Sequence, residues 1–96
     1  MQISMDTLIS KNKYNTINII DIRDSYSYNK GHIINAKNIP ANELLNNTKN
    51  YLNKNEVYYI YCQSGNTSNR VVRYLNANGY HTYDIIGGYN NYLLWK

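Results

Sequence analysis

The segment that most constrains the fold of this chain joins an apolar strand, the only cysteine and the start of a helix. Val57–Tyr61 is a run of β-branched and aromatic residues, which predicts a buried strand. Cys62 follows this strand directly, and the small, polar segment Gln63–Ser68 comes after it. Val71 and Leu75 then recur at helical spacing. This order predicts a unit in which the thiol lies at the carboxyl end of its strand.

The position of Cys62 predicts an activated thiol. The first N–H groups of a helix have no partner within the helix, and the helix dipole places partial positive charge at that end. A loop that bends around the cysteine can aim more N–H groups at its sulfur, and Gly65 permits the positive φ or close approach that such a bend needs. We therefore expect a lowered thiol pKa and a site that binds an anion or a charged sulfur adduct.

A structural role is the alternative interpretation of Cys62. A lone cysteine at the end of a strand often serves as a small buried hydrophobic residue. Six small or polar residues after a fully apolar strand are, however, unusual for a plain connection. Within them, Thr67 or Ser68 is expected to cap the helix that follows. The loop therefore favours a functional cysteine.

The length and composition of the chain exclude several classes of protein. Its 96 residues are enough for one domain, which we expect to span residues 1–96. No stretch approaches the roughly 20 apolar residues of a membrane span, and the first residues show no signal peptide. We therefore expect a cytoplasmic protein without a membrane partner.

Metal and nucleic-acid sites are not expected either. A single cysteine cannot form an internal disulfide, and no Cys or His pair, His32 and His81 included, has zinc-ligand spacing. The net charge of +4 would help to attract small anions. Because the basic residues are scattered along the chain, this charge does not indicate nucleic-acid binding.

Apolar periodicity predicts strands that alternate with helices along the whole chain. The expected strands are a short one at Ile3, Ile17–Ile22, a short one before Pro40, Val57–Tyr61 and Tyr80–Ile86. The expected helices are Met5–Ser10 with Ser4 as N-cap, one turn over Ser25–Lys30, Ala41–Leu52 with Asn42 as N-cap, Ser68–Asn78 with Gly79 at C′, and Tyr89–Lys96. Lys11–Thr16 is expected to be a loop, and the last helix is expected to dock on the sheet through Tyr92, Leu93 and Trp95. The alternation predicts an α/β fold in which a mostly parallel, five-stranded sheet has helices on both faces.

Charged residues follow the strand Ile17–Ile22. Asp21, Arg23 and Asp24 lie at its carboxyl end, where sheets of this class place their sites. The alternative is that Arg23 pairs with a neighbouring carboxylate and only fixes the loop. We expect Asp21 and Arg23 to support the site rather than to take part in the chemistry.

Three blocks of the sequence carry a family resemblance that covers essentially the whole chain. The first block consists of Asp21-Ile22-Arg23, then Tyr28-Asn29-Lys30-Gly31-His32-Ile33, Ala36 and Asn38-Ile39-Pro40. The second is Cys62-Gln63-Ser64-Gly65-Asn66, and the third is Gly87-Gly88 before an aromatic terminal helix. In this order and spacing, the blocks resemble the signatures of single-domain rhodaneses.

The resemblance implies a sulfurtransferase. Rhodaneses move a sulfane sulfur from a donor such as thiosulfate to a thiophilic acceptor, in a ping-pong reaction through a persulfide, which here would form on Cys62. The resemblance implies that backbone amides of the loop bind the donor anion and the persulfide. The residues are Gln63, Ser64, Gly65, Asn66, Thr67 and Ser68. No metal or organic cofactor is implied. The expected partners are a small sulfur-containing anion, a thiophilic acceptor and a protein that donates or accepts sulfur.

One departure from the family pattern concerns the loop. Many rhodaneses have Arg where this chain has Thr67, and a hydroxyl cannot replace a charged anion clamp. We therefore expect weaker binding of thiosulfate, with a smaller effect on persulfide formation. Arg70 on the following helix either reaches the mouth of the site or is an ordinary surface residue.

Three other functions remain as alternatives. A sulfur carrier without thiosulfate activity would need the same persulfide and would fit the absent loop Arg. A cysteine phosphatase needs Cys-x5-Arg, but Ser68 stands at that position and the loop is one residue shorter than phosphate requires. A non-catalytic interaction module would not need Cys62 and Gly65. Sulfur transfer is therefore the function that the sequence favours.

Overall fold

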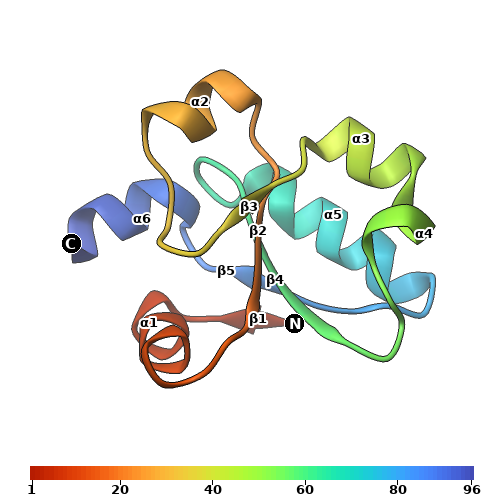
Figure 1. Cartoon of the computed structure of the whole chain (residues 1–96), viewed down its shortest axis with the longest axis horizontal. Coiled ribbons are helices and arrows are strands. Elements are labelled where there is room, and N and C mark those ends of the chain that lie inside the picture. Colours follow the sequence, from red (N-terminus) through yellow and green to blue (C-terminus); the bar gives the residue numbers. More distant parts are fainter.

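A five-stranded parallel sheet forms the centre of the fold (Figure 1). The computed structural model describes residues 1–96. In spatial order the strands are β1 (Gln2–Ile3), β5 (His81–Ile85), β4 (Val57–Tyr61), β2 (Asn18–Asp21) and β3 (Lys37–Asn38), and each neighbouring pair is parallel. The expected α/β fold is confirmed, and the three longer strands lie within one residue of their predicted bounds.

Helices cover both faces of the sheet. One face carries α1 (Met5–Tyr14) and α6 (Gly88–Trp95), and the other carries α3 (Ala41–Asn46), α4 (Thr48–Tyr51) and α5 (Asn66–Ala77), while α2 (Ser25–Lys30) follows β2 (Figure 1). Successive residues of a strand point to opposite faces. Ile19 therefore packs in the cluster with Leu8 of α1, and Ile20 packs in the cluster with Leu75 of α5.

Helix α1 is longer than the sequence predicts. The expected N-cap is confirmed, because the Ser4 hydroxyl accepts the Thr7 N–H at 3.2 Å. The helix continues to Tyr14, so the loop expected over Lys11–Thr16 was wrong for its first four residues. Basic residues in the last turn complement the negative end of the helix dipole. The side-chain amide of Asn12 also donates to the Ile34 carbonyl at 3.0 Å, which fixes this turn against the neighbouring segment.

The single helix predicted over Ala41–Leu52 is two helices, and this prediction was wrong. Helix α3 begins after Pro40 without a side-chain cap, so Asn42 is not an N-cap. The backbone leaves the helical region at Asn47 (φ −134°, ψ 38°). The Thr48 hydroxyl donates to the Leu44 carbonyl at 2.8 Å and takes an acceptor that a continuous helix would give to a backbone N–H.

Helix α5 begins two residues earlier than the sequence predicts. Gly65 precedes it with φ 105°, in the left-handed region that favours glycine. Thr67 and Ser68 consequently lie inside the first turn, and neither caps the helix. At the other end Gly79 has φ 92°, which confirms its expected C′ position.

The terminal helix docks less completely than expected. Tyr92 is buried against the sheet, but Leu93 and Trp95 are 51% and 47% exposed, so the docking predicted for these two was wrong. Gly87 and Gly88 both have positive φ at the expected sharp turn, and Gly88 is already the first residue of the helix. None of the helices has the length and apolar character of a membrane span.

Candidate active site

The loop after β4 lies at the carboxyl edge of the sheet, where it meets the end of β2 and the start of α6 (Figure 1). The parallel pairing of β2 with β4 sets Asp21 opposite Tyr61, so the residues that follow these strands emerge side by side. The Arg23 Nη1 group donates to Gln63 Oε1 at 2.9 Å, which joins the two segments directly. The structure thus brings together the charged strand end and the cysteine loop.

The Cys62 thiol is held by hydrogen bonds from its own loop. The backbone N–H groups of Gly65 and Ser68 donate to Cys62 Sγ at 3.1 and 3.3 Å, and Ser68 Oγ lies 3.3 Å from the sulfur. Burial raises the pKa of the Cys62 thiol. The Ser68 hydroxyl and the backbone N–H groups of Ser68, Gly65 and Ser64 lower it by hydrogen bonding, and the net pKa lies below the ordinary thiol value. This agrees with the expected amide nest around an activated thiol.

The other loop residues take different positions around the thiol. The Gln63 side chain is exposed and bonds to Arg23 and to Asn90. Asn66 and Thr67 are exposed in the first turn of α5, and neither makes a hydrogen bond to Cys62 Sγ. Ser68 is fully buried and faces the thiol.

Arg23 links the cysteine loop to the end of β2 and to the residue that follows α2. Its guanidinium donates to the Asp21 carboxylate through Nη2 at 2.7 Å and to the Gly31 carbonyl through Nη2 at 2.7 Å. The centroid of the Tyr89 ring lies 4.2 Å from the guanidinium carbon. Burial lowers the pKa of Arg23, but Asp21 and Tyr61 together raise it above its ordinary value, so the guanidinium stays charged. Arg23 therefore bonds to Gln63 and makes no hydrogen bond to the thiol.

The start of α6 holds the other side of the loop, which the sequence did not indicate beyond its two glycines. The Tyr89 N–H donates to the Cys62 carbonyl at 2.9 Å, and the Asn90 N–H donates to the Gln63 carbonyl at 3.0 Å. A Cβ on Gly88 would overlap the Cys62 carbonyl oxygen. The Gly87-Gly88 turn thus lets the free N–H groups of a helix start bind the carbonyls of the loop.

Asp84 of β5 is a site residue that the sequence analysis missed. Its Oδ1 lies 2.5 Å from Ser68 Oγ, and its side chain is 2% exposed. The available signal was a carboxylate within a predicted strand, between Tyr83 and Ile85. Cys62, Ser68 and Asp84 form one continuous chain of hydrogen bonds.

A hollow of about 450 Å³ opens beside the loop. It is lined by Ser64 and Gly65 of the loop, by Arg70 and Arg73 of α5, and by Asp84 of β5, but not by Cys62. Arg70 is exposed and lines this hollow beside the loop. No three His, Cys, Asp or Glu side chains converge as metal ligands would.

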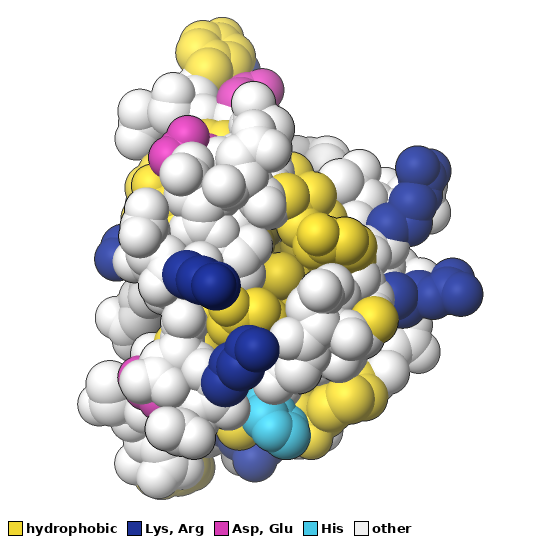
Figure 2. Space-filling model, turned by 90° about the vertical axis from the view of Figure 1, so that its right-hand side faces the viewer, with side chains coloured by type: hydrophobic (Ala, Val, Ile, Leu, Met, Phe, Trp, Pro, Cys, Tyr) yellow, Lys and Arg dark blue, Asp and Glu magenta, His cyan; other side chains and the backbone are white.

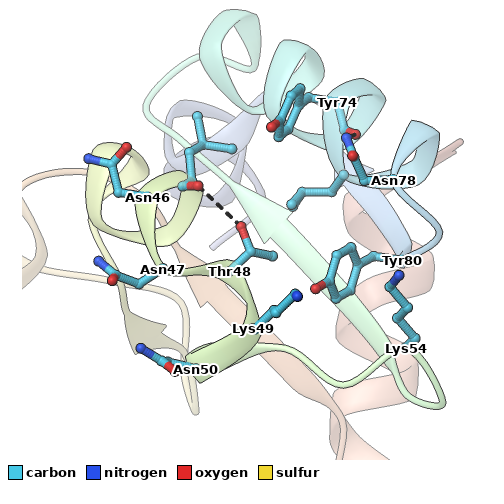
Figure 3. A pocket seen from close by; sticks show the side chains of 11 residues that line it. Asn46, Asn47, Thr48, Lys49, Asn50, Lys54, Tyr74, Asn78 and Tyr80 are labelled. Carbon is cyan, nitrogen blue, oxygen red and sulfur yellow. Dashed lines mark hydrogen bonds between the residues drawn. The ribbon is translucent and has the colours of Figure 1, made fainter.

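A second hollow lies at the opposite end of the sheet and is separate from the thiol. It has a volume of about 420 Å³ and is lined by the segments that precede β4 and β5 and by the end of α5 (Figure 3). Lys49 and Tyr80 point toward each other across it, and Lys54 lies beside the Tyr80 ring. Figure 2 shows this face, where Lys and Arg side chains border a strip of hydrophobic side chains. Cys62 does not line it, so the carboxyl edge remains the candidate active site.

Comparison with known proteins gives relatives along most of the chain. The chain is 32% identical over 80 residues to the uncharacterized protein YqhL of Bacillus subtilis. This match covers 82% of this chain and 63% of YqhL. It is 35% identical over 65 residues to YrkF of the same species, whose name describes a proposed sulfur carrier protein, and this covers 68% of the chain and 35% of YrkF. The chain thus spans less than two thirds of either relative.

Other matches extend over nearly the full length of both proteins. GlpE of Shewanella oneidensis, named as a thiosulfate sulfurtransferase, is 29% identical over 89 residues, which is 92% of this chain and 87% of GlpE. The crystal structure of a rhodanese-like domain protein from Staphylococcus aureus matches with a TM-score of 0.82 and 39% identity, over 92% of this chain and 87% of the other. The sequence model of the rhodanese-like domain matches residues 4–94. The chain therefore belongs to the rhodanese-like domain family.

Proposed function

We propose that residues 1–96 form a single sulfurtransferase domain in which Cys62 carries a sulfane sulfur from a donor such as thiosulfate to a thiophilic acceptor. The observation that supports this most is the nest around the thiol, where the N–H groups of Gly65 and Ser68 donate to Cys62 Sγ. Such donors favour the thiolate, which is the nucleophilic form of cysteine. GlpE, a relative over most of its length, is named for this activity.

The proposed reaction has two transfer steps. In the first, the Cys62 thiolate attacks the outer sulfur of thiosulfate, the Sγ–S bond forms, and sulfite leaves with the electron pair of the broken S–S bond. In the second, the acceptor attacks the outer sulfur of the persulfide and Cys62 leaves as a thiolate. The loop N–H groups act as the anion hole for the charged persulfide. Asp21 and Arg23 act only by holding the loop.

A persulfide carrier fed by a partner protein is the second candidate function. Thr67 favours it, because a neutral hydroxyl replaces the charged clamp that many family members use for the donor anion. YrkF, a relative over 68% of this chain, is named as a proposed sulfur carrier protein. Both functions use the same persulfide and differ in whether thiosulfate is a good donor.

Turnover of thiosulfate and cyanide separates the two functions. We expect measurable sulfite release that Cys62→Ser abolishes. Thr67→Arg should lower KM for thiosulfate several-fold by adding a bidentate cation, whereas the uncharged Thr67→Gln should not. Turnover in the unmodified protein would support the enzyme. Turnover that appears only with Thr67→Arg would instead favour the carrier, and none in any variant would contradict thiosulfate as the donor.

A further inference from the structure

Asp84 is a buried carboxylate whose role the proposed reaction does not explain. Its side chain is 2% exposed, and it takes no part in an ion pair, because the one pair in the chain joins Arg23 to Asp21. On the neighbouring strands its partners in register are Gln2 and Ile60, and neither carries a charge. Burial of a carboxylate without a cation is costly, so such a group calls for an explanation.

Ser68 connects this carboxylate to the thiol. Its hydroxyl oxygen lies 2.5 Å from Asp84 Oδ1 and 3.3 Å from Cys62 Sγ. The Gly65 carbonyl lies farther away, at 3.4 Å. The Ser68 side chain is fully buried, so water does not compete for its hydrogen bonds.

A hydroxyl has one proton, and this fixes the direction of the chain of hydrogen bonds. An ionised carboxylate only accepts, so Ser68 donates its proton to Asp84 and its oxygen accepts the S–H of Cys62. If Cys62 becomes a thiolate, the thiolate and the Asp84 carboxylate both need the single proton of the Ser68 hydroxyl. If the Ser68 hydroxyl bonds to the thiolate while Asp84 stays ionised, the buried carboxylate loses this donor, whereas a neutral Asp84 can itself donate to Ser68 Oγ.

We propose that Asp84 and Cys62 share a single proton through Ser68, so that Asp84 is a positioning residue that controls how readily the thiolate forms. In one form Cys62 is a thiol and Asp84 is ionised. In the other, the Cys62 proton has moved to Ser68 Oγ while the Ser68 proton has moved to Asp84 Oδ1. One S–H bond is broken and one carboxyl O–H bond is formed, and no proton enters or leaves.

The surrounding charges bear on this balance. Arg70 and Arg73 of α5 line the hollow that Asp84 also lines. Arg23 lies on the other side of the loop, bonded to Gln63. For its place in catalysis, this inference rests on the proposed sulfur transfer.

The pH dependence of Cys62 alkylation tests the shared proton. Cys62 is the only cysteine, so iodoacetamide reports on it alone. We expect Asp84→Asn to lower the midpoint of the rate profile by about one pH unit, because it removes a like charge and frees the Ser68 proton for the thiolate. In the Ser68→Ala background, the same change should shift the midpoint by less than half as much. The matched control Asp6→Asn, on the exposed start of α1, should cause no shift.

Two outcomes would overturn the proposal. One is an unchanged or raised midpoint in Asp84→Asn, and the other is an equal shift with and without Ser68, which would indicate an electrostatic effect through space. If Asp84→Asn does not fold, carboxyl carbon NMR of the unmodified protein serves instead. The Asp84 signal should show a step at the Cys62 midpoint that is absent in Cys62→Ser, and a signal without this step would contradict the shared proton.

The alkylation test does not involve a sulfur donor. A protein that behaves as expected in it but takes up no sulfur would contradict the proposed function and leave the role of Asp84 intact. A protein that takes up sulfur but shows no shift of the alkylation midpoint in Asp84→Asn would support the proposed function and contradict the role of Asp84.

Discussion

At the scale of single residues, a buried guanidinium holds together the parts of the site that come from distant segments. Arg23 is 9% exposed, and it bonds to Asp21, which is fully buried, as well as to Gln63 of the cysteine loop. Removing one member of a buried ion pair leaves an uncompensated charge, which costs more than the pair itself contributes. The pair therefore matters for folding as well as for loop position.

Arg23→Met should lower the free energy of unfolding by about 3 kcal/mol, because it leaves the Asp21 carboxylate buried without a partner. Replacing both residues, as Arg23→Met with Asp21→Leu, should cost less than the single change. Urea unfolding followed by circular dichroism measures both. A loss below about 1 kcal/mol for Arg23→Met would contradict a buried, coupled pair.

The pH dependence of sulfur loading follows from the lowered thiol pKa of Cys62. The thiolate fraction rises with pH through the thiol pKa, so the loading rate should rise in the same range and then level off. Because the pKa is lowered, the midpoint should lie below the value of about 8.5 for an ordinary thiol. Single-turnover loading with thiosulfate across a pH series measures it, and a midpoint above that of a free thiol would contradict the amide nest.

At the scale of elements, the start of α6 acts as a clamp on the cysteine loop. Gly88→Ala would place a Cβ against the Cys62 carbonyl oxygen and within 3.0 Å of the Gln63 carbonyl. The helix start must then move, and its N–H groups lose their acceptors. We expect a loss of roughly 2 kcal/mol in unfolding free energy and slower alkylation of Cys62.

Gly79→Ala is the matched control for this clamp. Gly79 also has positive φ, but its Cβ would meet only the Lys54 side chain at 3.4 Å or more, far from the thiol. It should cost about 1 kcal/mol through backbone strain and leave Cys62 alkylation unchanged. Equal effects of the two variants on alkylation would contradict a specific role for α6.

Much at this scale was predictable from local patterns. Strand bounds and the βα unit at Cys62 follow from runs of apolar residues and one glycine. The break between α3 and α4 was not predictable, because it depends on which acceptor the Thr48 hydroxyl takes. Asp84 was missed for a similar reason: only the packing of α5 on β5 brings it to Ser68.

At the scale of the whole molecule, positive charge favours anionic donors. The net charge is +4, and Arg70 and Arg73 line the hollow beside the loop. Surface attraction weakens as added salt shortens the Debye length from about 10 Å at 0.1 M to about 3 Å at 1 M. KM for thiosulfate should therefore rise several-fold over this range.

Variants identify where this salt effect originates. Arg70→Ala and Arg73→Ala should flatten the dependence of KM on salt, because they remove charge from the hollow itself. Lys11→Ala removes one charge from the exposed surface of α1 and should leave most of the dependence intact. Steady-state kinetics at several salt concentrations gives the slopes. The same slope in all variants would show that the hollow does not bind the donor.

Sulfur loading of Cys62 tests the central claim most directly. Intact mass of the protein after incubation with thiosulfate, followed by fragmentation, shows whether one sulfur has been added and where. We expect one sulfur on Cys62 that cyanide removes, and none in Cys62→Ser. The absence of an adduct with thiosulfate and with every other sulfane donor would contradict a sulfur-carrying cysteine. The amide nest would then have no persulfide to bind.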